Sequence, residues 1–359
     1  MRSRQASSRS LRMPSAPEAC TAPRSCEARL PEGDCVIRLA PIQVDETLSS
    51  WLLRSAVAAR CEPLTLTGVI WPGWRAWTVD LDRGLSDARL DALHRACGVD
   101  AERIRACEMR DLLRPLGASL SHAEPVWPWL AARGMRNRRN AGGQPFCPEC
   151  LASDVRPYLR RAWRAAWNVG CLNHGCELLE HCCKCLAVHQ PFRDTPRPVS
   201  LTSCWNCQFD HRSAIASRLD PWAAEMQARA DTVLKCGTGA LGSLEVATPA
   251  WFGVLQHCVR LKQPKELMVN GNPPVPIGPG LRFELLSVRE RHLRLGRVAS
   301  QLAQMTSQDV SCLLAGPQHP RSGEKRRSPT FRPNSGARPA GLVRQEWARL
   351  LRRMHRAYL

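Results

Sequence analysis

The sequence predicts a mainly α-helical, multi-domain protein that carries small metal-stabilised modules. Three observations predict this fold class. Apolar residues recur at helical spacing in several separate stretches. Pairs of cysteines, or of a cysteine and a histidine, recur with two intervening residues in the middle of the chain. Stretches rich in Pro, Gly and Ser lie between and beyond these regions and mark their boundaries.

The N-terminal part of the chain divides into two regions. Residues 1–35 are rich in Ser, Arg, Pro and Ala without hydrophobic periodicity, so we expect a disordered extension. Residues 36–140 are expected to form a helical domain. Its first helix is predicted from Leu48, Trp51 and Leu52, which share one helical face, with Asp45 or Thr47 as the N-cap.

A helix-turn-helix-like layout is predicted inside this helical domain. An amphipathic helix over 85–97, a short turn over 98–100 and a second helix over 101–109 give the pattern. Arg103, Arg105 and Arg110 lie on or next to the second helix, where such a motif contacts DNA. A packing hairpin with a solvated basic face has the same pattern, so both interpretations stay open.

Residues 145–212 contain four pairs of metal-ligand side chains. In order, they are Cys147 with Cys150, Cys171 with His174, Cys182 with Cys185, and Cys204 with Cys207. Two intervening residues let both side chains of a pair reach one tetrahedral ion. Twenty residues separate the first two pairs and eighteen the last two, which is the spacing of zinc ribbons and zinc fingers.

The gap of seven residues between His174 and Cys182 favours two sequential modules. We therefore expect two structural Zn²⁺ ions, one held by three cysteines and a histidine and one by four cysteines. A complete four-ligand shell leaves no position for water or substrate, so these sites are expected to stabilise the fold. Cys176 and Cys183 lie among the pairs but have no partner at the same spacing.

The C-terminal part is expected to be helical over 213–315. Helical patterns run over 222–234, 251–262 and 281–305, and a Pro- and Gly-rich stretch over 264–280 predicts a linker or long loop. Residues 316–359 are expected to be a basic, largely disordered tail, with a short basic helix over 345–358.

The net charge favours a polyanionic partner. The chain has 51 Lys and Arg against 32 Asp and Glu, a formal net charge of +19. The region 133–164 beside the first pair is strongly basic, so DNA contacts are expected from Arg136, Arg138, Arg139, Arg160, Arg161 and Arg164. A coding bias toward Arg would give a similar composition. Trp163 and Trp167 are spaced to pack together in a core.

The sequence lacks the motifs of several enzyme classes. It has no Gly-x-x-x-x-Gly-Lys-Ser/Thr phosphate loop, no His-Glu-x-x-His and no Gly-x-Ser-x-Gly, so no catalytic activity is expected. Alternatives remain. His181, His189 and His211 near the pairs suggest an HNH-like nuclease, and the pairs partly match a ubiquitin-ligase RING, which the seven-residue gap opposes. A zinc-scaffolded protein–protein adaptor or transcription regulator is a further alternative.

The combined motifs resemble the TniQ family of transposition proteins and the related target-selecting TnsD proteins. The resemblance rests on the segments 39–54, 145–151, 158–163 and 171–178 and on the last two cysteine pairs. It implies an N-terminal helix-turn-helix domain and tandem zinc fingers whose ligands are the eight paired residues.

The resemblance also implies a role in the insertion of a mobile element. A non-catalytic accessory protein would bind DNA and support target selection or resolution of insertion, alongside a DDE transposase and an AAA+ ATPase. A homodimer is a further possibility. We expect a cytoplasmic protein, because no stretch of about 18 apolar residues is present and cysteine use fits a reducing compartment. The resemblance implies a bacterial, nucleoid-associated protein.

Overall fold

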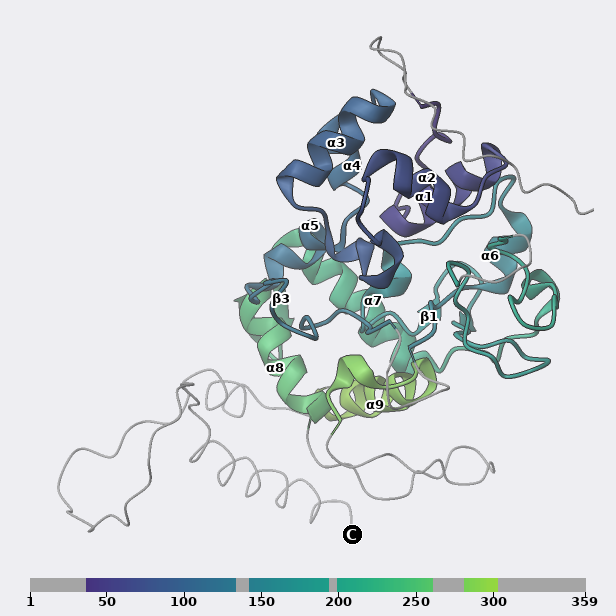
Figure 1. Ribbon diagram of the computed structural model, residues 1–359. Helices are drawn as coiled ribbons and strands as arrows, with labels where there is room; N and C mark the ends of the chain where they lie inside the picture. Colours follow the sequence, from purple (N-terminus) through teal and green to yellow (C-terminus); the bar gives the residue numbers. More distant parts are fainter. Residues whose placement is uncertain (1–36, 134–141, 194–198, 261–280, 303–359) are drawn as a thin grey trace, which may run out of the picture. The chain divides into compact units, whose positions relative to one another are not determined.

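The computed structural model describes residues 37–133, 142–193, 199–260 and 281–302. These residues form mostly helices (Figure 1), which confirms the predicted fold class. The helices are α1 (Leu48–Ala58), α2 (Pro63–Ile70), α3 (Asp87–Cys97), α4 (Ala101–Arg105), α5 (Met109–Leu113), α6 (Pro148–Ser153), α7 (Pro221–Cys236), α8 (Thr248–Arg260) and α9 (Val288–Leu302). Two antiparallel strand pairs are β1 (Gly170–Cys171) with β2 (Cys176–Glu177) and β3 (Thr238–Leu241) with β4 (Leu244–Ala247).

Several predicted features lie outside the described residues. They are the N-terminal extension over 1–35, the linker over 264–280, the basic tail over 316–359 and the arginines Arg136, Arg138 and Arg139. Among the described residues, no helix has the length and apolar character needed to cross a membrane.

The first helix begins where the sequence predicts. Thr47 is the N-cap of α1, and its side chain accepts the backbone N–H of Ser50 at 3.2 Å. The apolar face of α1 joins residues of α2, α3 and α4 in one hydrophobic cluster that includes Trp51, Leu93 and Ile104. This packing confirms the helical face predicted from Leu48, Trp51 and Leu52.

The helices α3 and α4 form the predicted hairpin, but the second helix is shorter than predicted. Gly98 takes the left-handed conformation that ends α3, and Asp100 caps α4. The helix predicted over 101–109 ends at Arg105, and the chain restarts as α5 at Met109. Between them, the buried carboxylate of Glu108 accepts the backbone N–H of Leu85 at 2.9 Å, so the chain turns into the interior instead of continuing the helix.

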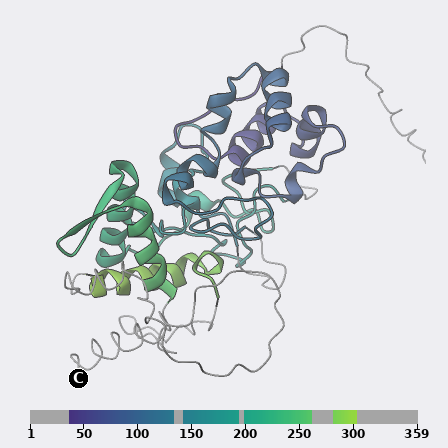
Figure 2. The ribbon, with the colours of Figure 1, turned by 90° about the vertical axis from the view of Figure 1, so that its left-hand side faces the viewer.

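A second hydrophobic cluster joins the Trp-rich central segment to the C-terminal helices. Trp129 contacts Trp167, Phe252 and Phe283 edge-on, with ring centroids 5.4–6.1 Å apart. Trp163 and Trp167 are both buried, which confirms the prediction that they pack in a core. The helices α7 and α9 pack against each other, and α8 lies against both (Figure 2).

Candidate metal centres

The first four-donor cluster is assembled from a helix start and a strand hairpin. Cys147 occupies the N-cap of α6 and its Sγ accepts the backbone N–H of Cys150 at 3.4 Å, which turns both thiols the same way. β1 and β2 pair with Cys171 opposite Cys176, and the turn between them carries His174. Gly175 supplies the positive φ of 62° that this tight turn requires.

The donor atoms of the first cluster have the separations that a tetrahedral ion needs. His174 Nδ1 lies 3.4 Å from Cys147 Sγ, 3.4 Å from Cys150 Sγ and 3.3 Å from Cys171 Sγ. The Sγ atoms of Cys150 and Cys171 are 3.6 Å apart. Ligands at the usual zinc distances of about 2.3 Å (S) and about 2.0 Å (N) would lie about 3.5–3.8 Å apart. The four donors therefore fit one tetrahedral ion.

The second cluster is built from two turns with the same backbone pattern. Leu186 and Gln208 each follow the second cysteine of a pair, have positive φ, and donate their N–H to the carbonyl of the first cysteine at 2.9 Å. The Sγ atoms of Cys182 and Cys207 are 3.6 Å apart, as are those of Cys185 and Cys204. These two clusters are the groups of four metal-ligand donors within 4.8 Å of one another among the described residues.

Each cluster has one thiol whose pKa is lowered, whereas neighbouring thiols raise the pKa of Cys150 and Cys171 and burial raises that of Cys182 and Cys204. Hydrogen bonds from the thiols of Cys150 and Cys171 lower the pKa of Cys147. At Cys185, burial acts to raise the pKa, but hydrogen bonds from the backbone of Ala187 and the side chain of Asn206 outweigh it and lower the pKa to about 6. Since the thiolate is the metal-binding form of cysteine, the clusters have the donor chemistry of two metal sites.

Of the predicted DNA-contacting arginines, Arg103 and Arg105 lie on α4 of the helical hairpin and Arg110 lies on α5, and all three keep some exposure. Arg103 is exposed on α4. Arg105 forms an exposed ion pair with Asp87 at 2.6 Å. The Arg110 guanidinium lies 5.4 Å from the centroid of the Trp127 ring and 2.8 Å from Nε2 of His122. Of the three, Arg103 is the side chain best placed to meet a phosphate.

The three arginines between the first two pairs that were predicted to contact DNA are paired with acidic residues of the chain. Arg164 is fully buried, with Nη2 2.6 Å from Asp80 and Nη1 2.8 Å from Asp82. Its predicted contact with DNA is wrong, because the guanidinium cannot reach the surface. Arg160 forms two hydrogen bonds with Asp154 at 2.8 and 3.0 Å, and Arg161 pairs with Asp45 at 3.2 Å. The basic, Trp-bearing segment is therefore mostly interior.

Asp80 and Asp82 are partners that sequence reasoning missed. Burial opposes ionisation of Asp80, but the guanidinium groups of Arg164 and Arg133 lower its pKa. More than fifty residues separate these aspartates from both arginines, so no local pattern in the sequence pairs them. The four side chains form a buried ionic network that fixes the Trp-rich segment to the N-terminal helices.

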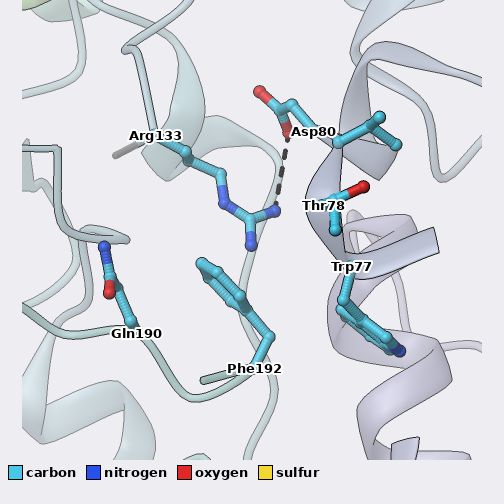
Figure 3. Close-up of a pocket in the computed structure, with 7 residues that line it drawn as sticks. Trp77, Thr78, Asp80, Arg133, Gln190 and Phe192 are labelled. Carbon is cyan, nitrogen blue, oxygen red and sulfur yellow. Dashed lines mark hydrogen bonds and ion pairs between the residues drawn. The ribbon is translucent and has the colours of Figure 1, made fainter. Parts of the chain in front are cut away.

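A small pocket of about 160 Å³ lies beside this network (Figure 3). The rings of Trp77 and Phe192 in its lining are nearly parallel, at 9°, with centroids 6.4 Å apart. The Arg133 guanidinium lies over Phe192 at 3.8 Å and pairs with Asp80. Pockets for small-molecule ligands typically measure about 300–1,000 Å³, so this one is too small to assign to such a ligand.

The histidines considered for a nuclease site do not form one. His189 and His211 are both buried, with ring centroids 4.9 Å apart and each ring packed against Phe146. Burial lowers the pKa of His189 to about 3 and that of His211 to about 4, so both rings are neutral. In this position neither ring can contact a phosphodiester, which opposes the HNH-like alternative.

Comparison with known proteins supports the family resemblance. The TniQ family model matches residues 37–178, a region that includes the helical hairpin and the whole first cluster. The second cluster lies beyond the matched region. No curated protein matches the chain. Residues 37–178 of this chain form a TniQ family domain.

Proposed function

We propose that this chain is a non-catalytic accessory protein of DNA transposition. It binds two structural zinc ions through the eight residues of the two clusters. It also binds DNA and the transposition partners of its mobile element, a DDE transposase and an AAA+ ATPase. The TniQ family domain over 37–178 is the observation that carries this proposal. The proposal keeps the three predicted regions: a helical domain over 36–140, two zinc modules over 145–212 and a helical C-terminal region over 213–315.

The metal part of the proposal is supported by donor number and geometry. Each cluster supplies four ligand atoms within 4.8 Å of one another, which completes a zinc shell without a place for substrate. Such an ion stabilises the fold and does not catalyse. The purified chain should therefore contain two equivalents of zinc, measured by atomic emission, and a chain without metal would remove this part of the proposal.

The DNA part is supported by exposed cations on the helical hairpin. Arg95 on α3 and Arg103 on α4 are both exposed. The test is the salt dependence of binding to duplex DNA, whose log–log slope has a magnitude of about 0.9 for each phosphate that the protein neutralises. The double variant Arg95→Ala/Arg103→Ala should bind more weakly and with a shallower slope. Arg212→Ala, another exposed arginine, is the matched control and should leave the slope unchanged.

A protein-binding scaffold is the second candidate function. Val155, Leu172 and Ile215 leave 99%, 44% and 93% of their surface exposed in segments that adjoin the first cluster. Arg160, Arg161 and Arg164 are meanwhile engaged within the chain. Salt-insensitive, weak DNA binding together with co-purification of the transposase or the ATPase would favour this candidate. Steep salt dependence would favour the first.

A further inference from the structure

A fifth sulfur lies against the first cluster. The Sγ of Cys176 is 3.6 Å from the Sγ of Cys147, the same separation as between Cys150 and Cys171 within the cluster. Cys176 is the cross-strand partner of Cys171 in the β1–β2 hairpin, and it is only 4% exposed. The cluster thus has five candidate donors for the four positions of a tetrahedral ion.

The position of Cys176 separates it from the four donors that share one centre. Cys147, Cys150, Cys171 and His174 have donor atoms that all lie within 4.8 Å of one another, and this set does not include Cys176. With Cys147 bound to a metal as thiolate, the hydrogen bond between the two sulfurs has one possible direction. The Cys176 thiol donates and the Cys147 thiolate accepts.

We propose that Cys176 is a reserve donor of the first cluster, an inference that rests on the proposed zinc binding there. While His174 completes the shell, the Cys176 thiol donates a hydrogen bond to Cys147 and orients that thiolate. When the imidazole is removed, a rotation of the Cys176 side chain brings its sulfur to the ion. The thiol then releases its proton to solvent, a metal–sulfur bond forms, and the metal–nitrogen bond is the one that breaks.

The hairpin geometry supports this exchange. His174 lies in the turn that joins β1 to β2, whereas Cys171 and Cys176 lie opposite each other on the paired strands. Removing a ligand from the turn leaves the pairing of the strands in place, so the reserve thiol stays beside Cys147. By contrast, Cys183 next to the second cluster is exposed, whereas Cys176 is buried against a ligand sulfur.

The test counts metal in wild type, in three variants of the full chain and in one control variant. Wild type and Cys176→Ser should each hold two equivalents of zinc, and His174→Ala should also hold two. The double variant His174→Ala/Cys176→Ser should hold one. In cobalt-substituted protein, His174→Ala should show stronger thiolate-to-metal charge transfer than wild type, because a sulfur replaces a nitrogen. Cys183→Ser is the matched control and should change none of these values.

Two outcomes would overturn the inference. His174→Ala holding a single metal would show that Cys176 cannot take the vacant position. The double variant holding two would show that the fourth ligand comes from elsewhere. A wild-type chain without metal at the first cluster would overturn the proposed metal centre itself, and this inference with it.

A second measurement applies if the His174 variants do not fold. Substitution of a residue that hydrogen-bonds a metal ligand typically costs about 10–100-fold in metal affinity. Competition with a chelator should therefore show a loss of about 10-fold in Cys176→Ala. Cys176→Ser, whose hydroxyl can still donate to Cys147, should recover most of it. Equal affinities in wild type and Cys176→Ala would contradict the hydrogen-bonding role.

Discussion

The first cluster is part of the main hydrophobic core, whereas the second lies outside both hydrophobic cores of the described chain. Cys147, Cys150 and Cys171 share their core with Trp163, Trp167 and the apolar faces of α7, α8 and α9. Around the second cluster, Leu186 is 66% exposed and Cys183 is exposed. Two clusters with similar donor chemistry therefore lie in very different packing environments.

Ionic contacts connect the first cluster further to the C-terminal helices. Arg289 of α9 pairs with Glu177 of β2 at 2.8 Å. Nδ1 of His292, also on α9, lies 3.4 Å from the carboxylate of Glu177. The two clusters offer the same number of donors, so we propose that the packing of the surrounding residues sets how much structure each metal would stabilise. Four sets of variants test this proposal, from the largest expected effect to the smallest.

Replacing one ligand in each cluster should give the largest difference in stability between the two clusters. Binding of a structural zinc contributes about 10–16 kcal/mol of apparent free energy, which equals or exceeds the stability of a typical domain. Cys150→Ser should lose one metal and unfold the region around the core. Cys204→Ser should lose one metal but keep most of its helical signal, measured by circular dichroism. Equal loss of helix in both variants would contradict the comparison.

The buried ionic network should give the next largest effect. Arg164→Met leaves the buried carboxylate of Asp82 with one of its two arginine partners, and breaking a buried pair costs about 3–5 kcal/mol. Arg105→Met removes an exposed pair and should cost about 1 kcal/mol or less. Denaturant unfolding measures both. Similar midpoints for the two variants would show that the network does not stabilise the Trp-rich segment.

Acid should destabilise the protein through His189 and His211. In the unfolded chain these rings bind protons near pH 6.5, but in the folded chain only near pH 3–4. The unfolded state therefore binds more protons between these values, and stability falls as the pH falls from about 6.5 to about 4. Each ring contributes at most about 1.4 kcal/mol per pH unit.

The acid effect is best measured as the slope of unfolding free energy between pH 6.5 and pH 5, with metal content checked at each point. His189→Phe/His211→Phe should flatten this slope, because the substituted rings do not titrate. His94→Phe replaces an exposed histidine and serves as the control. A slope that is unchanged in the double variant would assign the acid sensitivity to other groups.

The pair between α9 and β2 should give the smallest effect. Arg289 is 38% exposed, so Arg289→Met should cost about 1 kcal/mol or less. Amide hydrogen exchange should nevertheless quicken at the start of α9, because that pair connects the helix to the first cluster. Arg114→Met is the control: it removes an exposed ion pair with Asp111, three residues earlier in the chain, and should leave amide exchange in α9 unchanged.

Local features of the sequence were sufficient for the metal clusters and most helices. A pair of ligands with two intervening residues is a local pattern, and so are the N-cap of α1 and the glycine that ends α3. Trp163 and Trp167 could be placed in a core from their spacing, although the segment forms only the 3-10 turn Ala162–Arg164 and Trp167 lies outside it. These predictions depend on residues that are close in sequence.

Long-range partners could not be predicted in the same way. In the sequence, Arg164 stands among other basic residues and was therefore predicted to bind DNA. Its partners Asp80 and Asp82 lie 84 and 82 residues away, so no local pattern shows that they neutralise it. The helix predicted over 101–109 is broken by Glu108, whose acceptor role depends on Leu85. Cys176 lacks a partner at ligand spacing, and only the hairpin register brings it to Cys147.

Hydrogen exchange followed during stepwise metal removal by a chelator tests the unequal roles of the two clusters most directly. We expect removal of the metal of the second cluster to quicken amide exchange only within residues 182–207. Removal of the metal of the first cluster should quicken exchange in α6, β1, β2 and α9 together. If the metal of the first cluster can be removed while α9 keeps its protection, the first cluster does not support the core, and the two clusters do not differ in the way proposed.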